Sequence, residues 1–147
     1  MKNQFAAEYA QSRAILSQYN AAKAANDEAG MAAARAAHME QEARIEAKGT
    51  TSSRIYDRYE SAQERGNAYI DWDDVIWDEH VEGFVAGLRE CGIERFVFSS
   101  GWSNAVETAW KLQLNGCKLE GLVEINGRHK SFGSDEYAKV HGYLFSL

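Results

Sequence analysis

The stretch that decides the fold is FVFSSGWSNAVETAW, residues 96–110. An apolar run passes through two serines and a glycine into a helical pattern, an order that many phosphate-binding loops and nucleophile turns share. A phosphate loop needs several glycines and usually a lysine, whereas this turn has one glycine and no lysine. Ser103 and Asn104 are residue types that cap helices. We therefore interpret residues 99–104 as a capped connection between a strand and a helix.

The alternative interpretation is a ligand site or a catalytic site at the same turn. In open α/β sheets, ligands bind at the carboxyl ends of the strands. The polar residues that would line such a site, or bind an anion, are Ser99, Ser100, Ser103 and Asn104. A serine nucleophile needs a histidine and a carboxylate beside it, and the sequence pattern places neither there. We therefore expect no catalytic residue.

The periodicity around this turn predicts alternating helices and strands in residues 67–147. Apolar residues recur at helical spacing from Trp77 to Leu88, and Gly92 follows as a stop signal. Asn126-Gly127 is a strong signal for a hairpin turn, because both residues tolerate positive φ. In chain order we expect a helix over 73–91, a strand over 93–98, a helix over 103–115, a strand over 117–125, a turn at 126–127, a returning strand over 128–132 and a helix from Ser134. The final YLFSL is also compatible with a strand.

This order predicts an α+β fold. A helical crossover between 93–98 and 117–125 makes these two strands parallel neighbours, and the hairpin adds an antiparallel third strand. The expected architecture is an N-terminal helical hairpin or arm followed by a small three-stranded mixed sheet. The elements after the arm follow the order α-β-α-β-β-α, and the helices flank the sheet and cover its apolar face.

Residues 1–66 are expected to form the arm. They are rich in strong helix formers, above all alanine, and the chain contains no proline. The sequence NDEAG at 26–30 is the expected interruption, and Gly49 and Gly66 are expected helix ends. Because alanine buries little area, we expect an antiparallel hairpin that rests on the C-terminal domain or on a second copy, with a continuous coiled coil as the alternative. We divide the chain into an Ala-rich helical region, 1–66, and a small acidic α/β domain, 67–147.

The charge is unevenly distributed. Basic and acidic residues balance in 1–66, so 67–147 carries the whole net charge of −6. An acidic half repels nucleic acid and anionic membranes and attracts a basic protein surface. The carboxylates gather around two tryptophans, which suits an anchor for Arg or Lys, although carboxylates in the first turns of a helix are also favoured by the helix dipole alone. The expected partner-binding residues are Asp71, Trp72, Asp73, Asp74, Trp77, Asp78, Glu79 and Glu82.

The sequence contains no other strong candidate for a metal site, a reactive thiol or an anion site. The four histidines show no paired ligand spacing, Cys91 and Cys117 fit buried thiols, and GRHK at 127–130 fits a solvated turn. We therefore expect no metal and no cofactor. No apolar stretch approaches the roughly 20 residues that span a bilayer, and the N-terminus lacks an apolar signal core. We expect a cytoplasmic protein.

The second half also carries a family resemblance. The sequence GCKLEGLVEING at 116–127, with FVFSSGW before it and YLFS at 143–146 after it, resembles small uncharacterised proteins found mainly on plasmids, prophages and integrated elements of gut bacteria. The resemblance covers about residues 80–147. Some accessory proteins of such elements are anti-CRISPR or other anti-defence inhibitors. The resemblance therefore implies a non-enzymatic binder, and it transfers no catalytic residue.

These observations lead to one expected function and two alternatives. We expect a non-enzymatic inhibitor or regulator encoded by a mobile element, with an anti-CRISPR role as the leading hypothesis. It would bind a basic, nucleic-acid-handling protein such as a CRISPR effector through its acidic surface, and we expect no direct binding to nucleic acid or membrane. The alternatives are a small-ligand-binding protein or enzyme that uses the 99–104 turn, and a structural homodimer that assembles through residues 1–66.

Overall fold

The computed structural model describes residues 4–147. Its helices and strands are α1 (Phe5–Ala24), α2 (Glu28–Glu46), α3 (Thr50–Glu64), β1 (Ile70–Trp72), the short 3-10 helix η1 (Asp78–His80), α4 (Val81–Glu90), β2 (Arg95–Phe98), α5 (Ala105–Leu114), β3 (Lys118–Lys130) and β4 (Tyr137–Ser146). The fold of the described residues is α+β, as predicted, with five α-helices and a mixed sheet of four strands.

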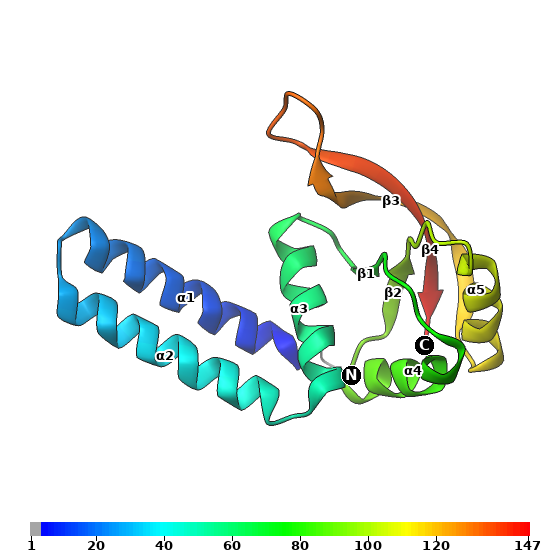
Figure 1. Ribbon diagram of the computed structural model, residues 1–147, viewed down its shortest axis with the longest axis horizontal. Coiled ribbons are helices and arrows are strands. Elements are labelled where there is room, and N and C mark those ends of the chain that lie inside the picture. Colours follow the sequence, from blue (N-terminus) through cyan, green and yellow to red (C-terminus); the bar gives the residue numbers. More distant parts are fainter. Residues whose placement is uncertain (1–3) are drawn as a thin grey trace.

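The first two helices form the predicted antiparallel hairpin, which projects away from the sheet. Helix α3 lies between this hairpin and the sheet (Figure 1). Asn26 makes the turn with a left-handed φ of 52°, and Asp27 caps α2 by accepting a hydrogen bond of 3.0 Å from the Gly30 N–H. This turn and this cap separate the two helices, so the predicted interruption at 26–30 is confirmed and the alternative of a continuous coiled coil is wrong. The hairpin rests on α3, where Phe5 packs against Tyr56 with 5.3 Å between the ring centroids.

The sheet has the strand order β1-β2-β4-β3. Strand β1 pairs with β2 in parallel, and β4 pairs with both β2 and β3 in antiparallel fashion. The prediction of three strands is therefore wrong in two ways: β1 is an additional strand, and the segment from Ser134 forms β4 instead of a last helix. Strands β2 and β3 run in the same direction, but β4 lies between them, so they are not the expected parallel neighbours.

The helix predicted over 73–91 begins only at Val81, after the loop 73–77 and η1. The two aspartates at its expected start have other partners. The Asp74 carboxylate accepts a hydrogen bond of 2.8 Å from the Val75 N–H, and Asp73 pairs with Arg58 on α3. Because aspartate side chains that bond to the nearby backbone compete with helix formation, the chain stays irregular until residue 78.

The Asn126-Gly127 pair is not a turn. Asn126 lies within β3, where its side-chain amide donates to the Arg65 carbonyl over 2.6 Å and its backbone N–H donates to the Asn67 side chain over 2.9 Å. A Cβ on Gly127 would lie 3.0 Å from the Ala138 carbonyl oxygen, so glycine allows β4 to approach closely. The ribbon turns instead between residues 131 and 136, where the Ser131 N–H donates to the Glu136 carbonyl over 2.8 Å and Gly133 has a φ of 72°.

The core fills the space between one face of the sheet and the helices α3, α4 and α5 (Figure 1). Its centre is Phe96, which stacks on Phe145 with 5.6 Å between centroids and meets Phe84 edge-on at 5.7 Å. Cys91 and Cys117 are buried free thiols, which confirms that prediction. In residues 4–147 the structure contains no helix with the length and apolar character that a membrane crossing requires.

Candidate interaction site

The first two residues of the predicted acidic surface lie inside the protein, because β1 is a buried strand. Asp71 is 1% exposed and forms an ion pair with Arg65, which is also buried. Trp72 is 4% exposed, and the guanidinium groups of Arg54 and Arg58 lie over its ring at 5.4 and 4.7 Å from the centroid. Asp71 therefore stabilises the fold, and almost none of the Trp72 side chain is accessible to a partner.

Asp73 is the next predicted residue, and internal cations compensate its charge. Its carboxylate accepts a hydrogen bond from Arg58 and a longer one, 3.4 Å, from Arg128 on β3. Burial opposes ionisation of Asp73, but the hydrogen bond and the charge of Arg58, helped by Arg128, outweigh it and lower the pKa of this carboxyl group. Asp73 thus ties α3 to the sheet and leaves little free charge for a partner.

The remaining five predicted residues are exposed: Asp74, Trp77, Asp78, Glu79 and Glu82. Trp77 is the largest of them and is 60% exposed. Asp78 forms an ion pair with Lys111 on α5, and Asp74 lies 4.0 Å from Arg58. The structure therefore brings the second half of the predicted set to the surface around one exposed tryptophan.

A groove of about 670 Å³ runs between the start of α3 and residues 72–84. This is far larger than the adjoining hollow of about 220 Å³ around Arg58 and Arg128. The walls of the groove are apolar and aromatic, with Ile55, Trp72, Ile76, Trp77 and Phe84. Its acidic side chains are Asp74 and Glu79, and its basic side chains are Arg54 and His80. Such a lining suits an apolar side chain that carries a polar or charged neighbour.

Trp72 also carries a hydrogen-bond donor without a partner. Trp72 lines the groove, and the buried indole N–H of Trp72 has no hydrogen-bond partner among the described residues. Buried donors are usually paired, so an unpaired one indicates that an acceptor is missing.

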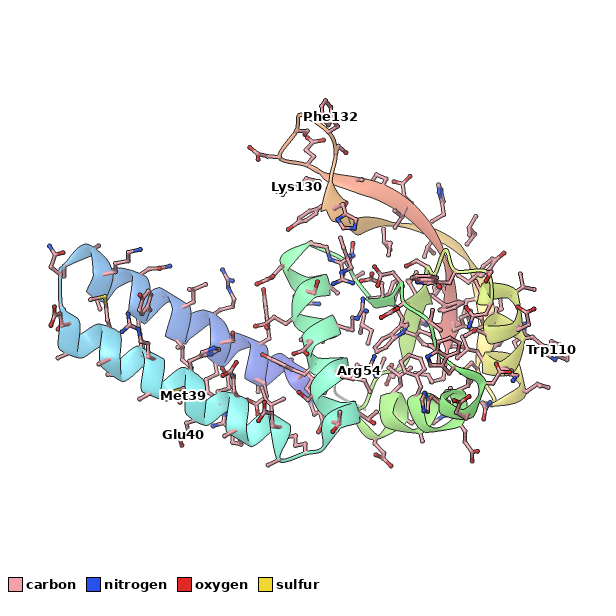
Figure 2. The ribbon with its side chains drawn as sticks, viewed as in Figure 1. Met39, Glu40, Arg54, Trp110, Lys130 and Phe132 are labelled. Carbon is pink, nitrogen blue, oxygen red and sulfur yellow. The ribbon has the colours of Figure 1, made fainter. Side chains whose placement is uncertain are left out.

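Helix α5 adds a second exposed apolar feature beside the acidic segment. Thr108 donates to the Ile76 carbonyl over 3.4 Å, and together with the Lys111–Asp78 ion pair this contact holds α5 against residues 76–78. The opposite side of the helix is exposed and apolar, and Figure 2 shows Trp110 pointing away from the sheet. This exposed set comprises Trp102, Val106, Trp110 and Leu114. The last three recur every four residues, which places them on one side of a helix, but this spacing does not tell which side faces the core.

The 99–104 turn is a connection, but its side chains do not cap the helix in the expected way. The Ser99 N–H donates to the Trp72 carbonyl over 2.9 Å, and the Ser100 hydroxyl accepts from the Trp102 N–H over 3.3 Å. Ser103 is exposed, and Asn104 precedes α5 without a side-chain cap. The Ser99 hydroxyl is buried with no partner among residues 4–147. The structure brings no described histidine, cysteine or carboxylate cluster of metal-binding type to this turn or elsewhere.

The domain of unknown function DUF7698 matches residues 54–147. The match begins inside α3, ahead of the predicted domain boundary at 66/67, and takes in every strand, whereas α1 and α2 lie outside it. No curated protein and no solved structure matches the chain.

Proposed function

We propose that this chain, which belongs to the DUF7698 family, is a non-enzymatic protein-binding module. The observation that carries the proposal is the groove of about 670 Å³, in which the exposed Trp77 stands beside apolar walls and the carboxylates Asp74 and Glu79. Tryptophans at the centre of a hollow, with charged groups around them, are the residues that dominate the free energy of protein association.

The groove favours a partner segment with an apolar side chain and an adjacent Arg or Lys. The apolar side chain would fill the space between Ile55 and Phe84, where it displaces water from apolar walls. The cation would stack on the face of Trp77 and pair with Asp74 or Glu79. Glu82 extends the negative charge beyond the groove and would steer a basic surface toward it, whereas the charge of Asp78 is balanced by Lys111.

The finer proposal is that the module is an inhibitor encoded by a mobile element, of the anti-CRISPR type. Its support is the resemblance of residues 80–147 and the acidic character of 67–147. In this proposal the exposed carboxylates take the place of nucleic-acid phosphates on the basic surface of a CRISPR effector or a related protein. The inhibitor would then compete with the nucleic acid for the same cations.

The test is a binding titration of the purified chain against CRISPR effectors at several salt concentrations. We expect Trp77→Ala to weaken binding at least tenfold, as loss of a hot-spot tryptophan does. The pair Asp74→Asn and Glu79→Gln should weaken binding and flatten its salt dependence. Glu40→Gln, an exposed carboxylate on α2 far from the groove (Figure 2), is the matched control and should bind like the wild type. If all variants bind equally, the groove is not the interface.

The alternative of a homodimer through residues 1–66 is checked on the same samples. Light scattering distinguishes a 16.5 kDa monomer from an assembly of twice that mass. A dimer that persists in Trp77→Ala but dissociates in Leu16→Glu, a change on the exposed surface of α1, would favour the arm as an interface.

A further inference from the structure

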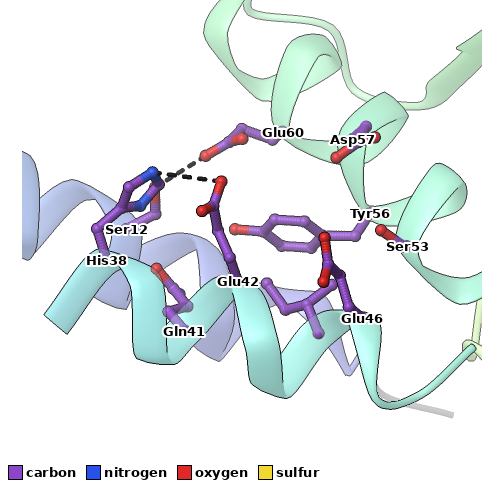
Figure 3. Close-up of a pocket in the computed structure, with 10 residues that line it drawn as sticks. Ser12, His38, Gln41, Glu42, Glu46, Ser53, Tyr56, Asp57 and Glu60 are labelled. Atoms are coloured by element: carbon purple, nitrogen blue, oxygen red, sulfur yellow. Dashed lines mark hydrogen bonds and ion pairs between the residues drawn. The ribbon is translucent and has the colours of Figure 1, made fainter. Parts of the chain in front are cut away.

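A further pocket lies on another side of α3, where this helix faces α1 and α2 (Figure 3). Its volume is about 240 Å³, below the range of roughly 300–1,000 Å³ typical of pockets for drug-sized ligands. It therefore suits a small group or the end of one side chain. Four carboxylates line it, Glu42, Glu46, Asp57 and Glu60, and among the described residues no lysine or arginine does.

The negative charge of this pocket is poorly compensated from within. The Ser12 hydroxyl donates to Glu60 over 2.8 Å, and His38 Nε2 lies 3.4 Å from Glu42. The carboxylates of Glu46 and Asp57 make no hydrogen bond or ion pair with another described residue. Burial, and after it the charge of Glu60, raises the pKa of Asp57, although Arg58 acts in the opposite direction. The carboxylates thus repel one another across the pocket.

Tyr56 adds an independent sign that a ligand is missing. Its side chain is 5% exposed, and its hydroxyl group points into the pocket among the carboxylates (Figure 3). This hydroxyl makes no hydrogen bond of normal geometry with residues 4–147. The nearby Ser12 hydroxyl acts on its pKa but donates its own proton to Glu60. Burial, followed by the charge of Glu60, raises the pKa of Tyr56, so the group stays neutral and keeps an oxygen that can accept a hydrogen bond. A buried hydroxyl without a partner is rare and calls for an explanation.

We propose that the pocket between α1, α2 and α3 binds an organic cation, a primary ammonium or guanidinium group on an alkyl chain. The N–H donors of such a group would satisfy Glu42, Asp57 and Glu60 in charge-assisted hydrogen bonds. The Tyr56 hydroxyl would accept a further one. Ile45 lines the pocket and offers an apolar contact to the alkyl chain. Anions are repelled by this lining, and the carboxylates do not converge as the ligands of a metal ion do.

The cation has two possible sources with the same chemistry: a free polyamine, or an Arg or Lys side chain of a protein. The inference stands apart from the proposed function, because the groove around Trp77 uses other residues of α3. A variant of one site should leave the other intact. An experiment that refutes one of the two proposals therefore leaves the other untouched.

The experiment is a titration of the full chain with putrescine and, separately, with N-acetyl-arginine amide. Binding is measured by calorimetry and by the chemical shifts of the amide groups in NMR. We expect saturable binding with shifts in α2 and α3. Glu42→Gln and Glu60→Gln should each weaken it about tenfold, the usual effect of losing one charged hydrogen bond. Glu40→Gln makes the same charge change on α2 outside the pocket and should leave the affinity unchanged. The tighter-binding probe identifies the source of the cation.

Tyr56→Phe separates binding from folding. It removes only the unpaired hydroxyl, so the free protein should keep or gain thermal stability while the affinity for the cation falls several-fold. If the Tyr56 hydroxyl had a purely structural role, Tyr56→Phe would lower the thermal stability and leave the affinity for the cation unchanged. The proposal is overturned if neither cation gives saturable shifts, if Glu40→Gln weakens binding as much as Glu42→Gln, if Mg²⁺ competes at equal concentration, or if Tyr56→Phe leaves the affinity unchanged.

Discussion

The hairpin of α1 and α2 and the body from α3 to β4 are held together by different means. The body buries large side chains completely, among them Phe96, Phe145 and Leu88. The hairpin buries one large ring, Phe5, where α1 meets α3. Its other buried apolar residues are a few alanines and isoleucines, and it relies on polar contacts, such as the Gln41 amide that donates to the Glu8 carbonyl over 2.7 Å. Because stability follows buried apolar area, the comparison indicates a stable body with a weaker appendage. The DUF7698 match, which begins at residue 54, coincides with the body.

The largest expected effect tests the centre of the body. Phe96→Ala removes a fully buried ring that contacts Phe84 and Phe145 and leaves a cavity. We expect a loss of about 4 kcal/mol in the free energy of unfolding, measured by urea denaturation. A loss below about 1 kcal/mol would mean that the aromatic cluster is not what stabilises the body.

The second effect concerns the tie between α3 and the sheet. Arg65→Met leaves the Asp71 carboxylate buried without its cation and also removes a hydrogen bond of 2.6 Å to the Asn126 carbonyl. We expect a loss of about 3 kcal/mol. The double variant Arg65→Met with Asp71→Leu should recover a good part of it, because no unpaired charge remains. A double variant as unstable as the single one would show that the other Arg65 contacts dominate.

The third effect should be confined to the hairpin. Ile15→Ala truncates one of its few large buried side chains and should cost about 2 kcal/mol there. In native-state hydrogen exchange we expect faster exchange of amides in α1 and α2, and unchanged protection in β2 and β4. Leu16→Ala, the exposed neighbour, is the control and should change little. Equal loss of protection in β2 would show that hairpin and body unfold as one unit.

The smallest effect is a pH dependence within the body, where Asp73 ties α3 to the sheet. Because the pKa of Asp73 is lowered in the folded state, its ionisation stabilises the fold above the unfolded pKa of about 3.9. This contribution is lost as the pH falls through the lowered folded value. Asp73→Asn should therefore reduce stability at pH 7 by less than about 1 kcal/mol. The gap between variant and wild type should narrow in melting curves recorded toward pH 3, and a constant gap would contradict the assignment.

The sequence predicted the hairpin better than the sheet because the hairpin's signals are local. Asp27 caps α2 and Gly49 follows it within the same stretch of chain, so spacing alone reveals both. The sheet depends on partners far apart in the sequence. Asn126 makes its decisive hydrogen bonds to Arg65 and Asn67, about sixty residues earlier, and these contacts override its preference for a turn.

The sequence predicted the exposure of only part of the proposed partner-binding surface. The segment around Trp77 is exposed and acidic as expected, whereas β1, with three residues, is too short for a periodic pattern to reveal, so the burial of Asp71 was missed. The acidic pocket was missed as well. Its signal was present as carboxylates at helical spacing, Glu42 with Glu46 and Asp57 with Glu60, but only the packing of α2 on α3 shows that they face one another.

The position of β4 between β2 and β3 has a consequence during protein synthesis. While residues 137–146 are still inside the ribosome, β2 has emerged with one edge unpaired, and its Phe96, Val97 and Phe98 side chains lack part of their cover. Strand edges in this state are prone to aggregate. The sheet of this protein therefore closes only after β4 has left the exit tunnel, and until then the edge of β2 stays open to aggregation.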